Sequence, residues 1–243
     1  MSMSSEISAI ELKRRLKRYY AHYPVYRPSF MAMRIAGERI RRMAETYLGG
    51  KLLDIGCGEK WKQDLIGHTV DQYLGLDHPE TAHDSSSVDR FGTAYDIPAE
   101  DGEFDSVICT SVLEHLEEPA QALRECRRIL KTGGHALFTM PQSWHIHEEP
   151  RDFYRYTRYG LEYLFEQSGF SIVELQPLSG FWVTNLSAQS YYWNRFRRKR
   201  RLHPMRWLAP VLITMKQLLG LLLNKFDRSY EFTWAYIAVV KKS

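Results

Sequence analysis

The feature that most constrains this chain is a regular alternation, from Lys51 onward, between short apolar runs and stretches of helical periodicity. Apolar runs of four or five residues that end in Gly or Asp are typical of strands in a parallel sheet wrapped by helices. Six such runs are found, at 52–55, 73–76, 91–94, 106–109, 136–140 and 172–175, and a longer one follows at 233–240. The alternation therefore predicts an α/β fold with a largely parallel sheet.

Helical periodicity falls between and before these runs. Helices are expected over 7–20, 29–47, 119–130 and 161–168, with Ser29 as an N-cap and with glycines at 49–50, 133–134 and 169 as stops. The chain of 243 residues fits one elaborated domain. We divide it into a helical cap (1–48), a core (49–186), a helical insertion (187–228) and a last core strand (229–243).

Charge is distributed unevenly along the chain. The net charge is +6 over residues 1–48, −12 over 49–190 and +9 over 191–228. An acidic middle argues against a nucleic-acid groove across the core. The three cysteines have no metal-ligand spacing, and we find neither a secretory signal nor a long uncharged apolar stretch. These features predict a cytoplasmic protein.

A glycine-rich turn follows the first predicted strand, in the sequence Leu-Asp-Ile-Gly-Cys-Gly ending at Gly58. Gly56 and Gly58 can adopt positive φ and let backbone amides approach a ligand closely. The next predicted strand ends at Asp77, about twenty residues further on, where a carboxylate can accept both hydroxyls of a ribose. The pair indicates a nucleotide-like cofactor much more specifically than either part alone.

From Lys51 to about Leu175 the chain resembles the class I S-adenosylmethionine-dependent methyltransferases, in particular the type 11 group. The matching segments are Leu-Asp-Ile-Gly-Cys-Gly, Gly-Leu-Asp, Tyr-Asp-Ile-Pro (95–98), Phe-Asp-Ser-Val (104–107), Leu-Glu-His-Leu (113–116) and Arg-Ile-Leu-Lys-Thr-Gly-Gly (128–134). The resemblance implies a Rossmann-like sheet of seven strands with helices on both faces and an antiparallel last strand. It also implies S-adenosylmethionine as the methyl donor.

The resemblance also implies which residues bind the donor. The first turn would hold its methionine part, Asp77 its ribose, and Asp96 with Ile97 its adenine. The full set that we assign to the donor is Asp54, Ile55, Gly56, Cys57, Gly58, Asp77, His78, Asp96, Ile97 and Thr110.

One departure from the family pattern concerns a third glycine, which many relatives carry soon after the second. This chain has Glu59-Lys60-Trp61 instead, which predicts a longer or tilted turn at the donor's carboxylate. The same departure argues against a dehydrogenase, because the nicotinamide fingerprint Gly-x-Gly-x-x-Gly requires glycine at position 61.

The loop after the fifth predicted strand, residues 141–157, concentrates ionisable and aromatic groups where the substrate should lie. Transfer to a hydroxyl requires a base, for which His147 is the first candidate and His145 the second; His115 is a further catalytic candidate. We assign substrate contacts to Asp152, Tyr154, Arg155 and Tyr156, and no metal ion is expected. The alternative is structural: residues 154–157 dock the next helix, Thr157 is its N-cap, and Arg151 pairs with Asp152.

The insertion combines the basic cluster 195–201 with an apolar helix over 204–226. Its stripe is Val211, Leu212, Met215, Leu218, Leu219 and Leu222, opposite a polar face with Lys216, Gln217 and Asn224. Such a segment can lie on an anionic bilayer, cover the substrate pocket or form a dimer face.

The sequence thus favours methyl transfer to oxygen, or to nitrogen, of a small molecule or glycan. The type 11 relatives that share the loop pattern look like proteins of surface-polysaccharide synthesis, which is the reason for naming a glycan. A lipid or quinone-like acceptor at a membrane surface, and a module that binds the donor without turnover, are the alternatives.

Overall fold

The structure, a computed structural model, describes residues 8–81, 84–199, 205–227 and 231–243. Its centre is a seven-stranded sheet in the order β3-β2-β1-β4-β5-β7-β6. The strands are β1 (Lys51–Ile55), β2 (Gln72–Asp77), β3 (Arg90–Phe91), β4 (Phe104–Thr110), β5 (Leu130–Pro141), β6 (Phe170–Pro177) and β7 (Ala235–Lys242). β7 is antiparallel to both β5 and β6, and the other neighbours are parallel. The predicted fold class is confirmed.

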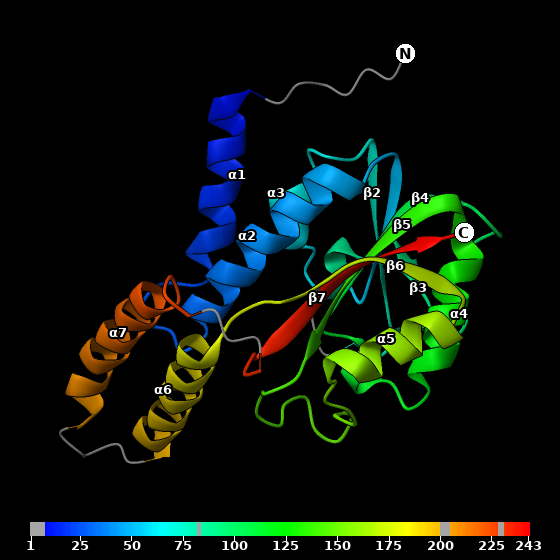
Figure 1. Ribbon diagram of the computed structural model, residues 1–243. Coiled ribbons are helices and arrows are strands. Elements are labelled where there is room, and N and C mark those ends of the chain that lie inside the picture. The colour runs from blue at the N-terminus through cyan, green and yellow to red at the C-terminus, as the bar shows by residue number, and fades with distance from the viewer. Residues whose placement is uncertain (1–7, 82–83, 200–204, 228–230) are drawn as a thin grey trace.

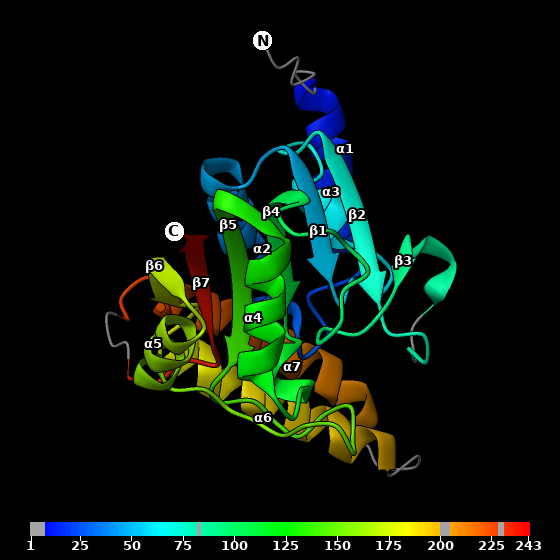
Figure 2. The same ribbon diagram turned by 90° about the vertical axis from the view of Figure 1, so that its right-hand side faces the viewer.

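Helices cover both faces of the sheet (Figures 1 and 2). α4 (Pro119–Ile129) and α5 (Arg158–Gln167) lie on one face. α2 (Phe30–Tyr47) and α3 (Lys62–Ile66) lie on the other, together with α1 (Ala9–Ala21), α6 (Phe181–Lys199) and α7 (Met205–Leu223). Adjacent strand residues alternate between these two cores: Leu53 joins the first and Leu52 the second.

Two predicted helix ends lie within one residue of their expected places, but the stop and capping signals expected there do not act. The helix α4 ends at Ile129 and leads directly into β5, so the glycines at 133–134 lie inside the strand and do not stop the helix. The pairing of β4 with β5 shifts register there, and Gly133 has a φ of 83°. Ser29 stands at the N-cap of α2, but its side chain makes no capping hydrogen bond.

The helix α6 starts at Phe181, ahead of residue 187, where we place the start of the insertion. α6 and α7 pack against each other and against α2, on the side where the strands end (Figure 2). The side chains of the basic cluster 195–201 lie outside the described part of the chain. Within that part, none of the helices combines the length and apolar character needed to cross a membrane.

The face of α7 that contacts the protein is not the one that the pattern indicates. Gln217, predicted on the polar face, is completely buried. Its Nε2 donates to the carbonyl oxygen of Pro28 at 2.8 Å, and its Oε1 accepts from the Met31 amide at 3.1 Å. Gln217 thereby satisfies backbone groups at the start of α2. Most of the apolar stripe, from Val211 to Leu222, is left facing outward.

Candidate functional site

The predicted site residues converge because β1, β2, β4 and β5 run parallel and end at one edge of the sheet. Ligands of open α/β sheets bind beyond this carboxyl edge, where neighbouring loops diverge. The loops after β1 and β2 form one half of the edge. The loops after β4 and β5 form the other half.

In the first half, the glycine-rich turn after β1 has the backbone that its sequence predicts. Gly56 has a φ of 67° and Gly58 a φ of 53°. A Cβ on Gly56 would collide with the Val112 side chain. The turn is also tied to β2, because the amides of Gly56 and Cys57 both donate to the Leu76 carbonyl, at 2.9 and 3.0 Å.

Lys60 explains how this turn closes without a third glycine. Its φ is 52°, a left-handed conformation that a side chain makes unfavourable. The ammonium group of Lys60 pairs with Asp89, and its side chain lies over Gly75, where a Cβ would meet Lys60 Cε. The chain therefore closes the turn with a lysine whose side chain is anchored to the next loop.

Asp77 ends β2 beside this turn. Its Oδ2 accepts from the Gly58 amide and its Oδ1 from the His78 amide, both at 2.7 Å. Each carboxylate oxygen keeps further acceptor capacity, because two oxygens offer about four lone-pair sites. The carboxylate is held in one orientation at the strand tip, as a ribose contact requires.

Asp54 has a supporting position, contrary to the direct role expected for its side chain. It is completely buried; its Oδ2 accepts from the Tyr73 hydroxyl at 2.5 Å and its Oδ1 lies 3.2 Å from Lys62 Nζ. Burial raises the pKa of Asp54, although Lys62 and Tyr73 act in the opposite direction. Cys57 is likewise completely buried. In this conformation the turn can contact a donor only through its backbone.

The remaining predicted donor residues lie around this half. Asp96 is exposed, and Ile97 is buried with its amide donating to Glu125 at 2.9 Å. Thr110 ends β4 and is nearly buried, while Ile55 is buried at the end of β1. The His78 ring accepts from the Glu80 amide at 3.0 Å.

In the second half, Asp152 and Arg155 hold the loop after β5 together. Arg155 donates to both carboxylate oxygens of Asp152 at 2.7 Å, and also to the carbonyls of Trp144 and His145. The guanidinium holds the pKa of Asp152 well below its usual range. Because Asp152 is nearly inaccessible, this pair orders the loop and leaves no free carboxylate for a substrate. The predicted pair of Arg151 with Asp152 is replaced by this one.

The two tyrosines of the loop differ in accessibility. Tyr156 is buried and donates its hydroxyl to the Leu113 carbonyl at 2.7 Å. Tyr154 is 40% exposed and donates to the Glu117 carbonyl at 2.9 Å. Thr157 caps α5 by accepting from the Gly160 amide at 3.2 Å. Tyr156 and Thr157 therefore have the structural role of docking the next helix. Of the two tyrosines, only Tyr154 is accessible to a substrate.

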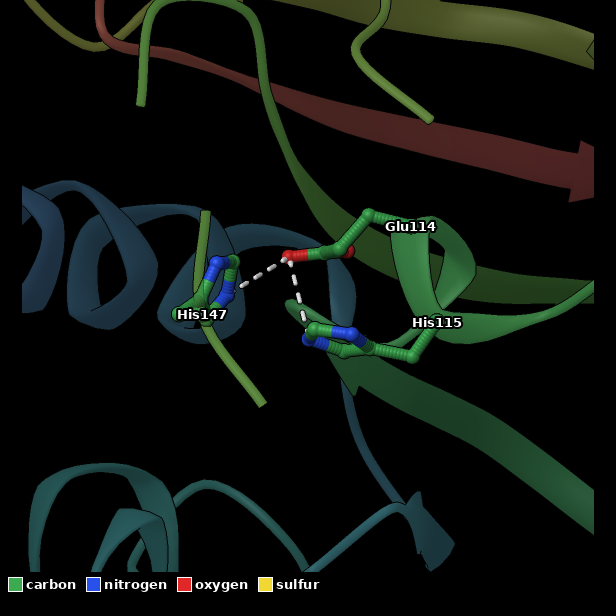
Figure 3. A group of neighbouring side chains, drawn as sticks. All are labelled: Glu114, His115 and His147. Carbon is green, nitrogen blue, oxygen red and sulfur yellow. Dashed lines mark ion pairs between the residues drawn. The ribbon is translucent and has the colours of Figure 1, made fainter. Parts of the chain in front are cut away.

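Three side chains meet where the two loops of this half approach each other. Figure 3 shows the Glu114 carboxylate between the rings of His115 and His147. Glu114 Oε1 lies 3.9 Å from His115 Nε2 and 4.0 Å from His147 Nε2, and the rings are 4.7 Å apart. His145 points elsewhere, with its ring 4.4 Å from that of Tyr191 in α6. Sequence reasoning placed both histidines at this edge and missed Glu114.

Burial perturbs this cluster. It raises the pKa of Glu114 to about 8. Burial, reinforced by the nearby His115, lowers the pKa of His147. His147 is therefore neutral near pH 7 and able to accept a proton. The only sequence signal for Glu114 is its position beside His115, because the neighbouring residues do not indicate that its carboxyl group is buried.

Two cavities lie away from the cluster. One, of about 540 Å³, lies near the amino ends of the strands and is lined by residues such as Lys51, Arg90 and Glu103. The other, of about 410 Å³, adjoins the glycine-rich turn between Trp61 and the helix α1 residues Arg15 and Arg18. Only the second borders the edge that carries the predicted site.

Comparison with known proteins agrees with this geometry. The family described as a methyltransferase domain matches residues 53–138. A probable S-adenosylmethionine-dependent methyltransferase of Mycolicibacterium smegmatis is 36% identical over 107 residues, which are 42% of this chain and 42% of that protein. Over these segments the chain is similar to the S-adenosylmethionine-dependent methyltransferases. The match spans less than half the length of that curated relative.

Other similarities extend further along the chain. A ubiquinone biosynthesis O-methyltransferase of Alkalilimnicola ehrlichii is 23% identical over 76% of this chain and 69% of its own length. A methyltransferase structure from Archaeoglobus fulgidus superposes with a TM-score of 0.55 and 16% identity, covering 86% of this chain and 94% of its own. The cyclase SpnF has the same fold, with a TM-score of 0.53, 19% identity, and coverage of 84% and 80%. These solved structures show the fold.

The chemistry of the residues at this edge fits S-adenosylmethionine. Asp77 presents a preoriented carboxylate for the ribose, and the backbone between Gly56 and Gly58 can approach the methionine part. Asp96 is exposed and can meet the edge of an adenine ring, whereas Ile97 is 2% exposed and offers almost no surface to the face of the ring. S-adenosylmethionine is the cofactor that these features accommodate.

Proposed function

We propose that this protein transfers a methyl group from S-adenosylmethionine to an oxygen of a small acceptor. The orientation of the Asp77 carboxylate by two backbone amides, next to the glycine-rich turn, is the observation that carries the proposal. The donor supplies a methyl carbon on a positively charged sulfur. Transfer forms a carbon–oxygen bond, breaks the carbon–sulfur bond and releases the proton of the acceptor hydroxyl.

The protein has to align the acceptor with the methyl carbon and take up that proton. The second half of the edge is suited to both tasks. The loop held by Asp152 and Arg155 forms one wall, and the exposed Tyr154 lies beside it. The neutral His147 imidazole is the first candidate base, with His115 4.7 Å away, and the exposed His145 is the second.

The chemical class of the acceptor is proposed from the loop sequence and from the surface of α7. A glycan remains the acceptor proposed from the loop pattern. Two observations support a lipid or quinone-like acceptor as the second candidate: α7 turns Val211, Met215, Leu218, Leu219 and Leu222 outward, and several of the curated relatives are ubiquinone biosynthesis O-methyltransferases. An exposed apolar stripe of this kind would place the site against a membrane surface or against a second copy of the chain.

Flotation with anionic liposomes tests the membrane contact. The wild-type protein should float, and a variant with Val211, Met215 and Leu218 changed to Ser should stay at the bottom of the gradient. A wild-type protein that never floats, but runs as a dimer in which this variant is monomeric, would assign the same face to self-association.

Calorimetry and product analysis test the activity. We expect both S-adenosylmethionine and S-adenosylhomocysteine to bind, and S-adenosylhomocysteine to be released when the acceptor is present. Candidate phenols, quinols and glycans form the acceptor panel. Binding without release across the whole panel would support the alternative of a non-catalytic module, because a shared fold does not fix the function.

A further inference from the structure

The cluster of Glu114, His115 and His147 has a composition that goes beyond an acid–base pair. Each of the three residues offers one ligand atom, and these atoms lie within 4.8 Å of one another. Two imidazoles and a carboxylate are the ligand set of many catalytic zinc and non-haem iron sites. We propose that these three residues bind a divalent transition-metal ion such as Zn²⁺.

Hydrogen bonds on the far side of each ring orient both histidines for this task. His115 Nδ1 lies 2.5 Å from the Arg151 carbonyl oxygen, and His147 Nδ1 lies 3.2 Å from the His145 carbonyl oxygen. A carbonyl only accepts, so each Nδ1 carries the proton and each Nε2 keeps its lone pair. Both lone pairs are therefore available on the side of Glu114. A carbonyl partner on the second nitrogen is the usual arrangement around a metal-binding histidine.

The surroundings of Glu114 support the metal site independently of the histidines. It is 1% exposed, and its Oε2 accepts no hydrogen bond within the described part of the chain. Its Oε1 lies too far from either imidazole for a hydrogen bond. A buried polar atom without a hydrogen-bond partner is unfavourable. A cation between the three groups would satisfy the carboxylate and both nitrogens together.

The separations allow an ion after a small adjustment. Ligand atoms around a tetrahedral ion with bonds of 2.0–2.1 Å are about 3.3 Å apart. The observed 3.9 and 4.0 Å from Glu114, and a separation of the two nitrogens of no more than 4.8 Å, would close to this value if the side chains each moved by less than about 1 Å. Glu148, whose carboxylate is 3.7 Å from His115 Nε2, lies within reach on the open side.

Such an ion would have an open coordination position toward solvent. An acceptor hydroxyl or a water molecule could occupy it, and coordination would lower the pKa of that group. The ion would then replace His147 in assisting proton removal. Metal binding itself does not depend on which acceptor, if any, the protein methylates.

The test measures metal binding on the full chain without any acceptor. Protein treated with a chelator and then dialysed against Zn²⁺ should retain one ion per chain, with a Kd of about 1 µM or lower by competition with a chromogenic chelator. Glu114→Gln, His115→Asn and His147→Asn should each weaken binding at least about tenfold. Mg²⁺ should not compete, because it prefers all-oxygen sites. Fe²⁺ and Mn²⁺, measured in parallel, identify the preferred ion.

His68 provides a matched control, because its Nε2 lies 3.2 Å from Glu45 in another histidine–carboxylate pair. His68→Asn and His145→Asn should bind Zn²⁺ as the wild type does. To guard against misfolding, each variant is also melted with and without Zn²⁺; the wild type should gain thermal stability and the three ligand variants should not. Wild-type protein without stoichiometric Zn²⁺, or binding that survives all three substitutions, would overturn the site. Donor calorimetry on Glu114→Gln separates this outcome from a failure of the methyl-transfer proposal.

Discussion

The donor half of the carboxyl edge, after β1 and β2, is held mainly by backbone hydrogen bonds, whereas the acceptor half, after β4 and β5, is held by side chains. Amides of Gly56, Cys57 and Gly58 fix the first half to β2 and to Asp77. Arg155 orders the second half through Asp152 and nearby carbonyls. The first arrangement suits one invariant ligand. The second can change its substrate by side-chain substitution without rebuilding the sheet.

The largest expected effect concerns the buried pair beneath the donor half. Lys62→Met leaves Asp54 buried with only the Tyr73 hydroxyl as a partner, and should lower the free energy of unfolding by about 3 kcal/mol. Urea denaturation measures this. The double variant Asp54→Leu/Lys62→Met should recover more than half of the loss, because it removes both charges. A single variant within about 1 kcal/mol of the wild type would show that backbone bonds alone hold the turn.

Asp77→Ala should have the next largest effect, on ligand binding. Removal of a charged hydrogen-bond acceptor from the ribose contact should weaken S-adenosylhomocysteine binding by about 1.5 to 3 kcal/mol. Calorimetry measures the change. Asp71→Ala, at an exposed position just before β2, is the control and should bind normally. Unchanged affinity in Asp77→Ala would remove the donor half as the binding surface.

A cluster of Glu103, Arg90 and Lys51 lies at the opposite edge of the sheet. It shows how much a partly exposed group of charges contributes to stability, in comparison with the buried pair of Asp54 and Lys62. Hydrogen bonds from Arg90, and also from Lys51, lower the pKa of Glu103 to about 2 from an ordinary value of 4.5. A lowered pKa means that the stabilisation is present above pH 4.5 and is lost as the pH falls toward 2. After allowance for solvent screening, we expect a loss of about 1 to 2 kcal/mol over this interval. Denaturation at a series of pH values should show a shallower slope in Glu103→Gln.

The smallest effect is expected at Lys60, within the donor turn. Lys60→Gly and Lys60→Ala both remove the pair with Asp89, but only glycine adopts a φ of 52° without strain. The glycine variant should therefore be more stable than the alanine variant by about 1 kcal/mol. Thermal unfolding of the two variants gives the difference directly. Equal stabilities would mean that the turn relaxes to another conformation when the lysine is removed.

The sequence by itself determined the donor half and the order of elements. Strand periodicity, positive-φ glycines and an acid at the next strand end are local properties, so the turn at Gly56 and Gly58 and the position of Asp77 could be predicted from contiguous residues. The backbone of Lys60 could not be predicted, because it depends on the contact with Asp89, 29 residues away.

Tertiary structure alone decided the acceptor half and the insertion. Glu114 and His147 meet only because two loops leave adjacent strand ends, and the depth of burial that isolates the carboxylate depends on everything packed around it. Gln217 was assigned to an outer face because polarity alone does not show which backbone groups a helix will meet when it docks. Local pattern thus specified the backbone, while long-range packing specified which side chains became partners.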